Sequence, residues 1–301
     1  MNLELRDCSR QSKKIPDAGP DIWDLFVPAT AVYVQPPDLL DALSFVPMTG
    51  RPYILAETTW KTVKGIEYDV AVLPWGATEA HNYHLPYGTD NYESSYVAAE
   101  AARKAWEKKA RVVVLPTIPF GVNTGQLDIR LTINMNPSTQ AMVLGDIARS
   151  LEAQGIRKLV IINSHGGNDF RQMIRELQMT CGVFIATVNW WNCVDVMLYY
   201  DEPGDHAGEL ETSVMMEIAP ELLLPVAEAG DGKAKKFKID GLRNGIAWAP
   251  RTWTKVTDDT GSGDPSRATR EKGVRHLEAV TDAVADFLIQ LAEAESPDSY
   301  E

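Results

Sequence analysis

Residues 68–90 read YDVAVLPWGATEAHNYHLPYGTD, an apolar run followed directly by a cluster of histidine and carboxylate side chains. The run YDVAVL (68–73) is rich in β-branched residues, which is typical of a strand buried on both faces of a parallel sheet. Three more runs of this kind follow along the chain, at residues 111–115, 158–163 and 183–189. The sequence therefore predicts several buried strands.

Helical segments separate these strands. Residues 137–154 start with Pro-Ser-Thr and end before Gly155, which are signals for the first turn and for the carboxyl end of a helix. Further helices are expected over residues 91–110, 169–180, 209–217 and 270–294. Strands that alternate with helices form βαβ units, so we predict an α/β fold, a three-layer α/β/α sandwich with a mainly parallel sheet.

Two segments are less regular. Residues 127–135 (LDIRLTINM) alternate between apolar and polar side chains and could form a further strand. Residues 1–51 are rich in proline and have little periodicity, yet they contain several large apolar side chains. We interpret residues 1–51 as an N-terminal extension or arm that packs on the main domain, residues 52–301, or on a neighbouring subunit.

Composition excludes several classes of protein. The net charge is −13, and the one basic run, residues 233–238, is short and interpreted as a solvated loop. This predicts no binding to nucleic acid and none to an anionic membrane surface. The N-terminus resembles no signal peptide, no apolar stretch reaches the length of a membrane span, and the three cysteines have unrelated spacings. We therefore expect a cytoplasmic protein.

Candidate metal ligands follow the first strand. Glu79 and His81 are two residues apart, so in an extended segment their side chains point to the same side. Asp90 comes at the start of the next helix. Imidazole and carboxylate groups are the ligands expected for zinc or manganese, and one carboxylate can bridge two ions because it has two oxygens.

Two more clusters lie at strand and helix junctions. His165, Gly166 and Gly167 follow the strand at 158–163, and glycines allow the backbone to pass close to a ligand. His206 and Glu211 lie on either side of a predicted helix start. Each cluster alone also fits a plain role, either a tight turn or an acidic helix N-terminus. Because such junctions converge at one edge of a parallel sheet, we expect all three clusters to meet there.

The segments ATEAHNYHLPYGTD, NSHGGN and HAGELETS, in this order, resemble the signature segments of the creatininase (creatinine amidohydrolase) family. The resemblance implies a three-layer α/β/α fold, two divalent metal ions (Zn or Mn) and a homo-oligomer, often a hexamer. It further implies a small-molecule amide substrate whose C–N bond is not a peptide bond.

The resemblance also assigns roles to residues of this sequence. Glu79, Asp90 and His165 match the ligands of one metal, while His81, Asp90 and Glu211 match those of the second. His206 matches the residue that transfers a proton, and His84 matches a histidine that supports the ligands from outside. Trp190 and Trp191, with Gly166 and Gly167, are candidate substrate contacts, although core or interface packing would explain the two tryptophans equally well.

This sequence departs from creatininase itself in three places. Gly167 stands where creatininase has a glutamate that binds the first metal, residues 123–133 (NTGQLDIRLTI) replace a common family segment, and the N-terminal extension is additional. The substrate therefore stays open. The alternatives are a formamide deformylase of the same family acting on a pyrimidine-type substrate, and a non-catalytic metal-binding oligomeric scaffold.

Overall fold

A computed structural model describes residues 50–296 and residue 300. The segment 1–51 predicted to be an arm lies outside the described residues, apart from its last two positions. Across the part of the chain that the structure describes, no helix combines the length and apolar character needed to cross a membrane.

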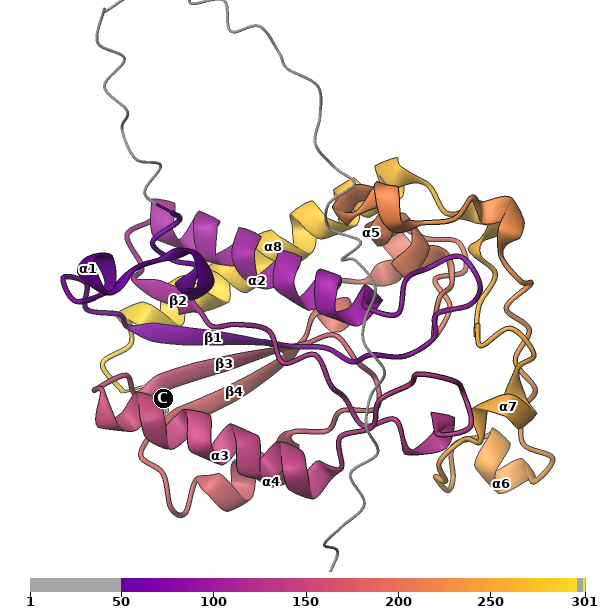
Figure 1. Ribbon diagram of the computed structural model, residues 1–301, viewed down its shortest axis with the longest axis horizontal. Helices are drawn as coiled ribbons and strands as arrows, with labels where there is room; N and C mark the ends of the chain where they lie inside the picture. Colours follow the sequence, from indigo (N-terminus) through magenta and orange to yellow (C-terminus); the bar gives the residue numbers. More distant parts are fainter. Residues whose placement is uncertain (1–49, 297–299, 301) are drawn as a thin grey trace, which may run out of the picture. The chain divides into compact units, whose positions relative to one another are not determined.

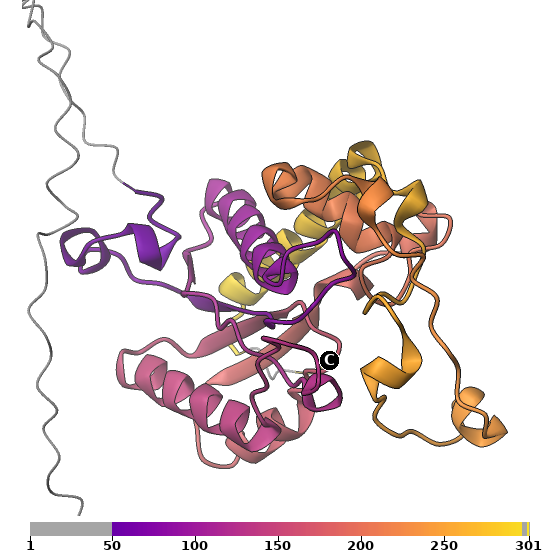
Figure 2. The same cartoon turned by 45° about the vertical axis from the view of Figure 1, so that its right-hand side comes forward.

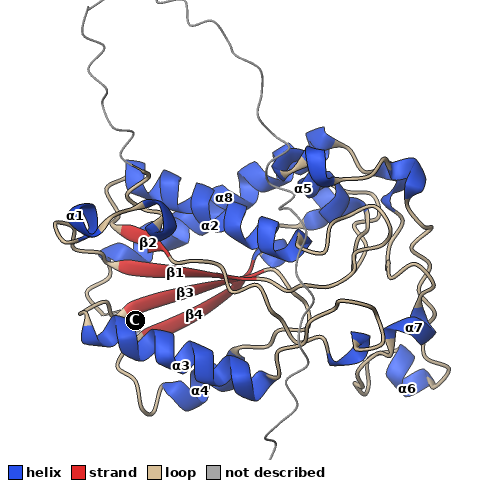
Figure 3. Ribbon diagram, in the orientation of Figure 1, coloured by secondary structure: helices blue, strands red, loops and turns tan. Residues whose placement is uncertain are grey.

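Four parallel strands form the sheet of the described chain, in the order β2-β1-β3-β4 (Figures 1 and 3). Their bounds are Val70–Trp75 for β1, Val112–Val114 for β2, Lys158–Asn163 for β3 and Phe184–Asn189 for β4. All four were predicted, and each end agrees within two residues. Pairing of Trp75 with Asn163, and of Asn163 with Asn189, brings the carboxyl ends of β1, β3 and β4 to one edge.

Strand β1 is buried along its whole length because successive side chains point to opposite faces, and both faces are covered. Val70 and Val72 belong to one apolar cluster with side chains of α2 and α8. Ala71 and Leu73 belong to a second cluster with side chains of α3 and α4. The unbroken apolar run in the sequence therefore reflects a strand placed between two helical layers.

The helices make the outer layers of a three-layer α/β/α sandwich, as predicted (Figures 1 and 2). Helices α2 and α8 lie on one face with α5 packed against α8, and α3 and α4 lie on the other face. Their bounds are Trp60–Val63 (α1), Thr89–Glu107 (α2), Pro137–Ala153 (α3), Arg171–Leu177 (α4), Glu209–Ile218 (α5), Asp240–Arg243 (α6), Trp253–Val256 (α7) and Arg270–Glu293 (α8).

The sequence signals for helix ends correspond to real boundaries. Pro137 occupies the first turn of α3, and Gly155 follows its end with φ of +82°, a conformation that glycine adopts without strain. Helix α4 is shorter than expected, because residues 169–170 and 178–180 lie outside it.

The strand suggested for residues 127–135 is wrong. This segment forms turns, and its pairing is limited to isolated bridges such as Ile133 with Thr78. Leu127 and Leu131 are 66% and 73% exposed, and Leu131 has φ of +65°, which no strand contains. The alternation of apolar side chains therefore does not correspond to a buried face.

Candidate metal centre

The three predicted clusters meet at the carboxyl edge of the sheet. The loop after β1 carries Glu79 and His81, the first turn of α2 carries Asp90, and the turn after β3 carries His165. Helix α5 contributes Glu211 from its first turn. The strands are parallel and in register, so their carboxyl ends position these side chains side by side.

Close contacts join the predicted ligands. His81 Nε2 lies 2.8 Å from Asp90 Oδ1, and His165 Nδ1 lies 2.9 Å from Glu79 Oε1 and 3.1 Å from Asp90 Oδ2. The two oxygens of Asp90 thus face two different histidines. This is the arrangement that a carboxylate needs in order to contact two cations at once.

Three groups of side chains place potential ligand atoms within 4.8 Å of one another in the described chain. Glu79, Asp90 and His165 form one, and His81, Asp90 and Glu211 form another, so the two groups share Asp90. They coincide with the two ligand sets expected from the sequence. A third group combines Glu79 and His81 with His206.

Backbone carbonyls orient the two candidate histidine ligands. His81 Nδ1 lies 3.2 Å from the Glu79 carbonyl, and His165 Nε2 lies 3.1 Å from the Val122 carbonyl. A carbonyl only accepts, so each of these nitrogens carries the hydrogen in a neutral ring, and the other ring nitrogen has a free lone pair. Those free nitrogens, His81 Nε2 and His165 Nδ1, are the ones that face the carboxylates.

These donor atoms fit a metal ion. His81 Nε2 and Asp90 Oδ2 are buried, and neither forms a hydrogen bond of acceptable geometry with any residue in the described ranges. Unsatisfied buried polar atoms are costly, and a divalent cation would satisfy nitrogen and oxygen donors together. The mixture of imidazole and carboxylate donors suits zinc or manganese.

The electrostatics indicate a site built for positive charge. Burial lowers the pKa of His81, but the carboxylates of Asp90, Glu211 and Glu79 raise it more, to about 10. Burial raises the pKa of Asp90, whereas the adjacent His81 and His165 bring it below its ordinary value. Without metal, protons on the histidines therefore balance the buried carboxylates, and a cation can replace those protons.

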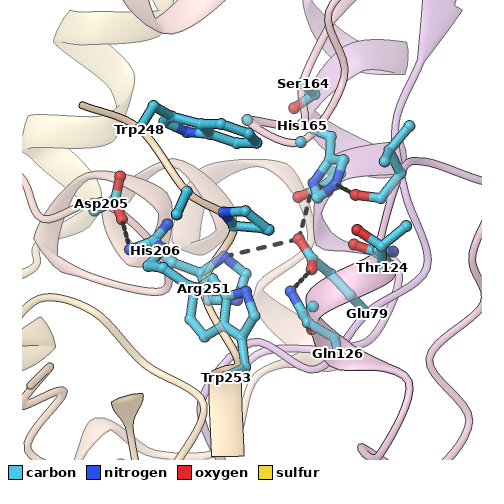
Figure 4. A pocket seen from close by; sticks show the side chains of 18 of the residues that line it. Glu79, Thr124, Gln126, Ser164, His165, Asp205, His206, Trp248, Arg251 and Trp253 are labelled. Atoms are coloured by element: carbon cyan, nitrogen blue, oxygen red, sulfur yellow. Dashed lines mark hydrogen bonds and ion pairs between the residues drawn. The ribbon is translucent and has the colours of Figure 1, made fainter. Parts of the chain in front are cut away.

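A cavity of about 290 Å³ opens onto these side chains (Figure 4). Figure 4 shows Glu79 and His165 on one side, and Arg251 with His206 across from them. Trp248 and Trp253 also line the cavity. The metal centre therefore lies at the bottom of a small pocket with a partly aromatic wall.

His206 faces the pocket in a defined orientation. Its Nε2 lies 2.9 Å from the Ala80 carbonyl, so this nitrogen carries the hydrogen in the neutral ring. Its Nδ1 lies 3.8 Å from Glu79 Oε1. The ring packs against those of His81 and Trp253, with centroids 4.1 and 4.8 Å away. Nδ1 is thus a potential proton acceptor beside the metal centre.

The remaining predicted site residues lie around this pocket. Gly166 and Gly167 line it, and a Cβ at Gly167 would come within 2.5 Å of His165 Nε2. Trp190 and Trp191 line an adjoining cavity of about 140 Å³, although Trp190 is only 1% exposed. His84 is buried, and its Nε2 lies 2.9 Å from Thr212 Oγ1 of α5, the helix that carries Glu211.

Several polar neighbours were not identified from the sequence. Buried Gln126 donates a hydrogen bond to Glu79 Oε2. Ser164 donates to Glu93 Oε2 at 2.9 Å and accepts from Trp190 Nε1 at 2.7 Å. Gln126 belongs to residues 123–133, which replace a common segment of the family. No pattern in these residues indicated a site. Arg251 lies further along the chain, in a region without periodicity.

Most of this chain is similar to known proteins. A family model described as creatinine amidohydrolase matches residues 56–288. A mycofactocin precursor peptide peptidase from Mycobacterium tuberculosis is 28% identical over 222 residues, which cover 70% of this chain and 81% of the relative. A creatinine amidohydrolase from Pseudomonas putida is 25% identical over 272 residues, with coverages of 79% and 97%.

Solved structures agree with the fold. The structure of a Bacteroides fragilis protein, described as a candidate creatinine amidohydrolase, superposes with a TM-score of 0.78 and 43% identity, covering 83% of this chain and 99% of that one. Creatininase structures described as Zn-Zn and Mn forms superpose with TM-scores of 0.65 and 0.66 at 23% identity. Each covers 80% of this chain and 99% of the creatininase.

Proposed function

This chain belongs to the creatininase family, and we propose that it is a metal-dependent amidohydrolase acting on the C–N bond of a small, non-peptide amide. Named members of the family are hydrolases. The observation that carries the proposal is the pair of three-residue groups that share Asp90 at the bottom of the pocket. A structural metal site is normally closed, whereas this one opens to a cavity.

Two divalent ions, Zn or Mn, are the proposed cofactors. Glu79, Asp90 and His165 would hold one ion, and His81, Asp90 and Glu211 would hold the other. The contacts of Asp90 Oδ1 with His81 and of Asp90 Oδ2 with His165 support its role as the bridge. When bound, such a pair would lower the pKa of a water molecule toward about 7 and polarise a carbonyl group.

The chain's own side chains supply proton transfer and positioning. His206 Nδ1 faces Glu79, so it can accept a proton from the attacking water and deliver it to the departing nitrogen. Gln126 donates to Glu79 and fixes the carboxylate's orientation. Gly166 and Gly167 have no side chains and so leave the substrate a path to the metal centre.

The size of the pocket favours a compact substrate. Its volume of about 290 Å³ is at the lower end of the roughly 300–1,000 Å³ typical of ligand pockets. A creatinine-type lactam or a formamide fits this volume better than a long peptide. Because one relative is named as a peptidase, a test of the substrate class must include a peptide for comparison.

The proposal is tested by loading the full chain with Zn or with Mn. The loaded protein is then assayed with creatinine, an N-formylaminopyrimidine and a short peptide, and the loss of each substrate and the appearance of its hydrolysis product are followed by chromatography with mass detection. We expect turnover of at least one non-peptide amide and none by Asp90→Ala. Cleavage of the peptide alone would overturn the substrate class. Equal activity of Asp90→Ala would overturn the metal-dependent mechanism, and no activity with any amide would favour the non-catalytic scaffold.

We also propose that the protein is a homo-oligomer, as its resemblance to creatininases implies, and that it is cytoplasmic, as expected from its sequence. Light scattering coupled to size-exclusion chromatography would test the assembly, and a monomer of 33.3 kDa would contradict it.

A further inference from the structure

A further cavity adjoins the metal pocket, and its lining is basic although the protein's net charge is −13. Its volume is about 530 Å³, and it lies between residues 234–243 and 250–256, which include the short helices α6 and α7 (Figure 1). We call it the basic cavity. Six cationic side chains line it: Lys235, Lys236, Lys238, Arg243, Arg251 and Lys255.

Only half of these cations have acidic partners among the described residues. Lys235 pairs with Asp258, Arg243 with Asp240, and Arg251 with Asp205. The other three form no ion pair within the described ranges: Lys236, Lys238 and Lys255. Three uncompensated positive charges around one cavity create a local potential that attracts an anion.

The basic cavity borders the metal pocket, since Pro250 and Arg251 line both. Arg251 Nη1 lies 2.5 Å from Asp205 Oδ2, and its guanidinium stacks 4.7 Å from the centre of a Trp253 ring. Figure 4 shows Arg251 on the side of the metal pocket opposite His165. The basic cavity is therefore the neighbouring space that a substrate with its amide at the metal centre would enter if it reached past Arg251.

The lining of the basic cavity is not purely charged. Phe237, Leu242 and Val256 contribute apolar surface between the cations. A site of this kind suits an organic anion better than a free ion, because the apolar surface contacts the carbon skeleton while the lysines contact the charge.

We propose that the basic cavity binds an anionic group, a carboxylate or a phosphate, carried by the substrate at the end remote from the amide bond. This inference rests on the proposed function, because it assumes that the amide occupies the metal pocket. It narrows the substrate class to small amides with an anionic substituent. It also gives the basic segment around Lys236 a role beyond that of a solvated loop.

The test uses three aromatic amides that differ at one position: para-acetamidophenol, para-acetamidobenzoate and para-acetamidophenyl phosphate. Their dissociation constants for the full, Zn-loaded chain are measured by calorimetry. The variant Lys236→Gln/Lys238→Gln/Lys255→Gln removes the unpaired charges. The matched control, Lys61→Gln/Lys64→Gln/Lys108→Gln, removes the same charge from exposed lysines on α1, just after α1 and just after α2.

We expect the wild type and the control to bind one or both anionic amides about tenfold more tightly than the neutral phenol. The cavity variant should lose that preference, and added salt should weaken it in the wild type. Whether the benzoate or the phosphate binds more tightly identifies the anionic group.

Two results would overturn the inference: no preference for either anion in the wild type, or a preference that persists in the cavity variant. The second result would place the anion on the metal ions instead. Calorimetry requires no turnover, so a chain that hydrolyses none of the amides could still show the binding preference. Failure of the proposed function is therefore distinguishable from failure of this inference.

Discussion

Two regions of this protein bury histidine side chains and shift their pKa values in opposite directions. At the metal centre, His81 is fully buried and has carboxylates around it, which raise its pKa to about 10 against the effect of burial. In the core, His276 of α8 is equally buried beside Tyr200, and burial lowers the pKa of His276 to about 4. Its Nδ1 lies 3.0 Å from the Tyr200 hydroxyl, and the rings of Tyr199 and Trp190 surround it.

The difference shows that burial of a histidine is not itself a sign of function. A buried imidazole without acidic neighbours stays neutral and packs like an aromatic side chain. One among carboxylates at the carboxyl edge of a parallel sheet is instead a candidate metal ligand or proton-transfer group. Substitutions at Asp90, His206, Gly167 and His276 test this contrast.

Asp90→Ala should remove the feature that distinguishes the metal centre most clearly. Asp90 contacts both His81 and His165, so its loss should abolish binding of both ions and lower activity by 10³-fold or more, on the order of what metal activation of water provides. Elemental analysis and turnover check this. Asp282→Ala, at an exposed ion pair with Lys104, is the matched control, and retention of two ions by Asp90→Ala would refute the bridge.

His206→Asn should separate proton transfer from metal binding. It removes Nδ1, so activity should fall by about 10²–10⁴-fold while the metal content is unchanged. Steady-state kinetics and elemental analysis of the same sample measure both quantities. Loss of metal in parallel with activity would instead make His206 a ligand, as the group of His206 with Glu79 and His81 permits.

Gly167→Ala should disturb the orientation of a ligand, while its neighbour provides the control. The new Cβ would lie 2.3 Å from the Val122 carbonyl oxygen and 2.5 Å from His165 Nε2, so His165 must move. We expect metal affinity to fall about 10–100-fold, as when a ligand loses its orienting contacts. Gly166→Ala meets nothing within 4 Å and should bind metal normally in the same titration. Equal affinities would contradict the role of Val122 in holding His165.

His276→Gln should reduce the acid sensitivity of folding. The folded-state pKa of about 4 lies below the ordinary value of 6.5, so the unfolded chain binds more protons between these limits and stability falls as pH drops through that window. Near pH 5 this costs the wild type about 2 kcal/mol, which a side chain that does not titrate avoids.

Urea unfolding of the metal-free wild type and of metal-free His276→Gln, near pH 5 and near pH 7.5, measures how much unfolding free energy each protein loses on acidification. His84 has a similarly lowered pKa and is present in both, so only the difference between the two proteins is interpreted. An equal loss of unfolding free energy on acidification would show that His276 is already protonated in the folded core.

Much of this structure could be predicted from sequence because its signals are local. The strands β1 and β3 are continuous apolar runs, and α3 has proline at its start and Gly155 after its end. The convergence of the three clusters followed from a general property of parallel sheets. The strand predicted for residues 127–135 was wrong because alternating apolar residues form a strand only when one face is buried. Here Leu131 is exposed.

The outer part of the pocket could not be predicted. Lys236, Arg243 and Lys255 come from loops and short helices without periodicity, and only the fold brings them to one cavity. Gln126 contacts Glu79 from a segment with no recognisable motif. Side chains that meet through loop geometry leave no regular spacing in the sequence, in contrast to those that follow strands.

Anomalous X-ray diffraction from crystals of the Zn-loaded protein, recorded at the zinc absorption edge, would locate the bound ions directly. We expect two peaks, one among Glu79, Asp90 and His165 and the other among His81, Asp90 and Glu211. A single peak among Glu79, His81 and His206, with Asp90 touching no ion, would contradict this arrangement.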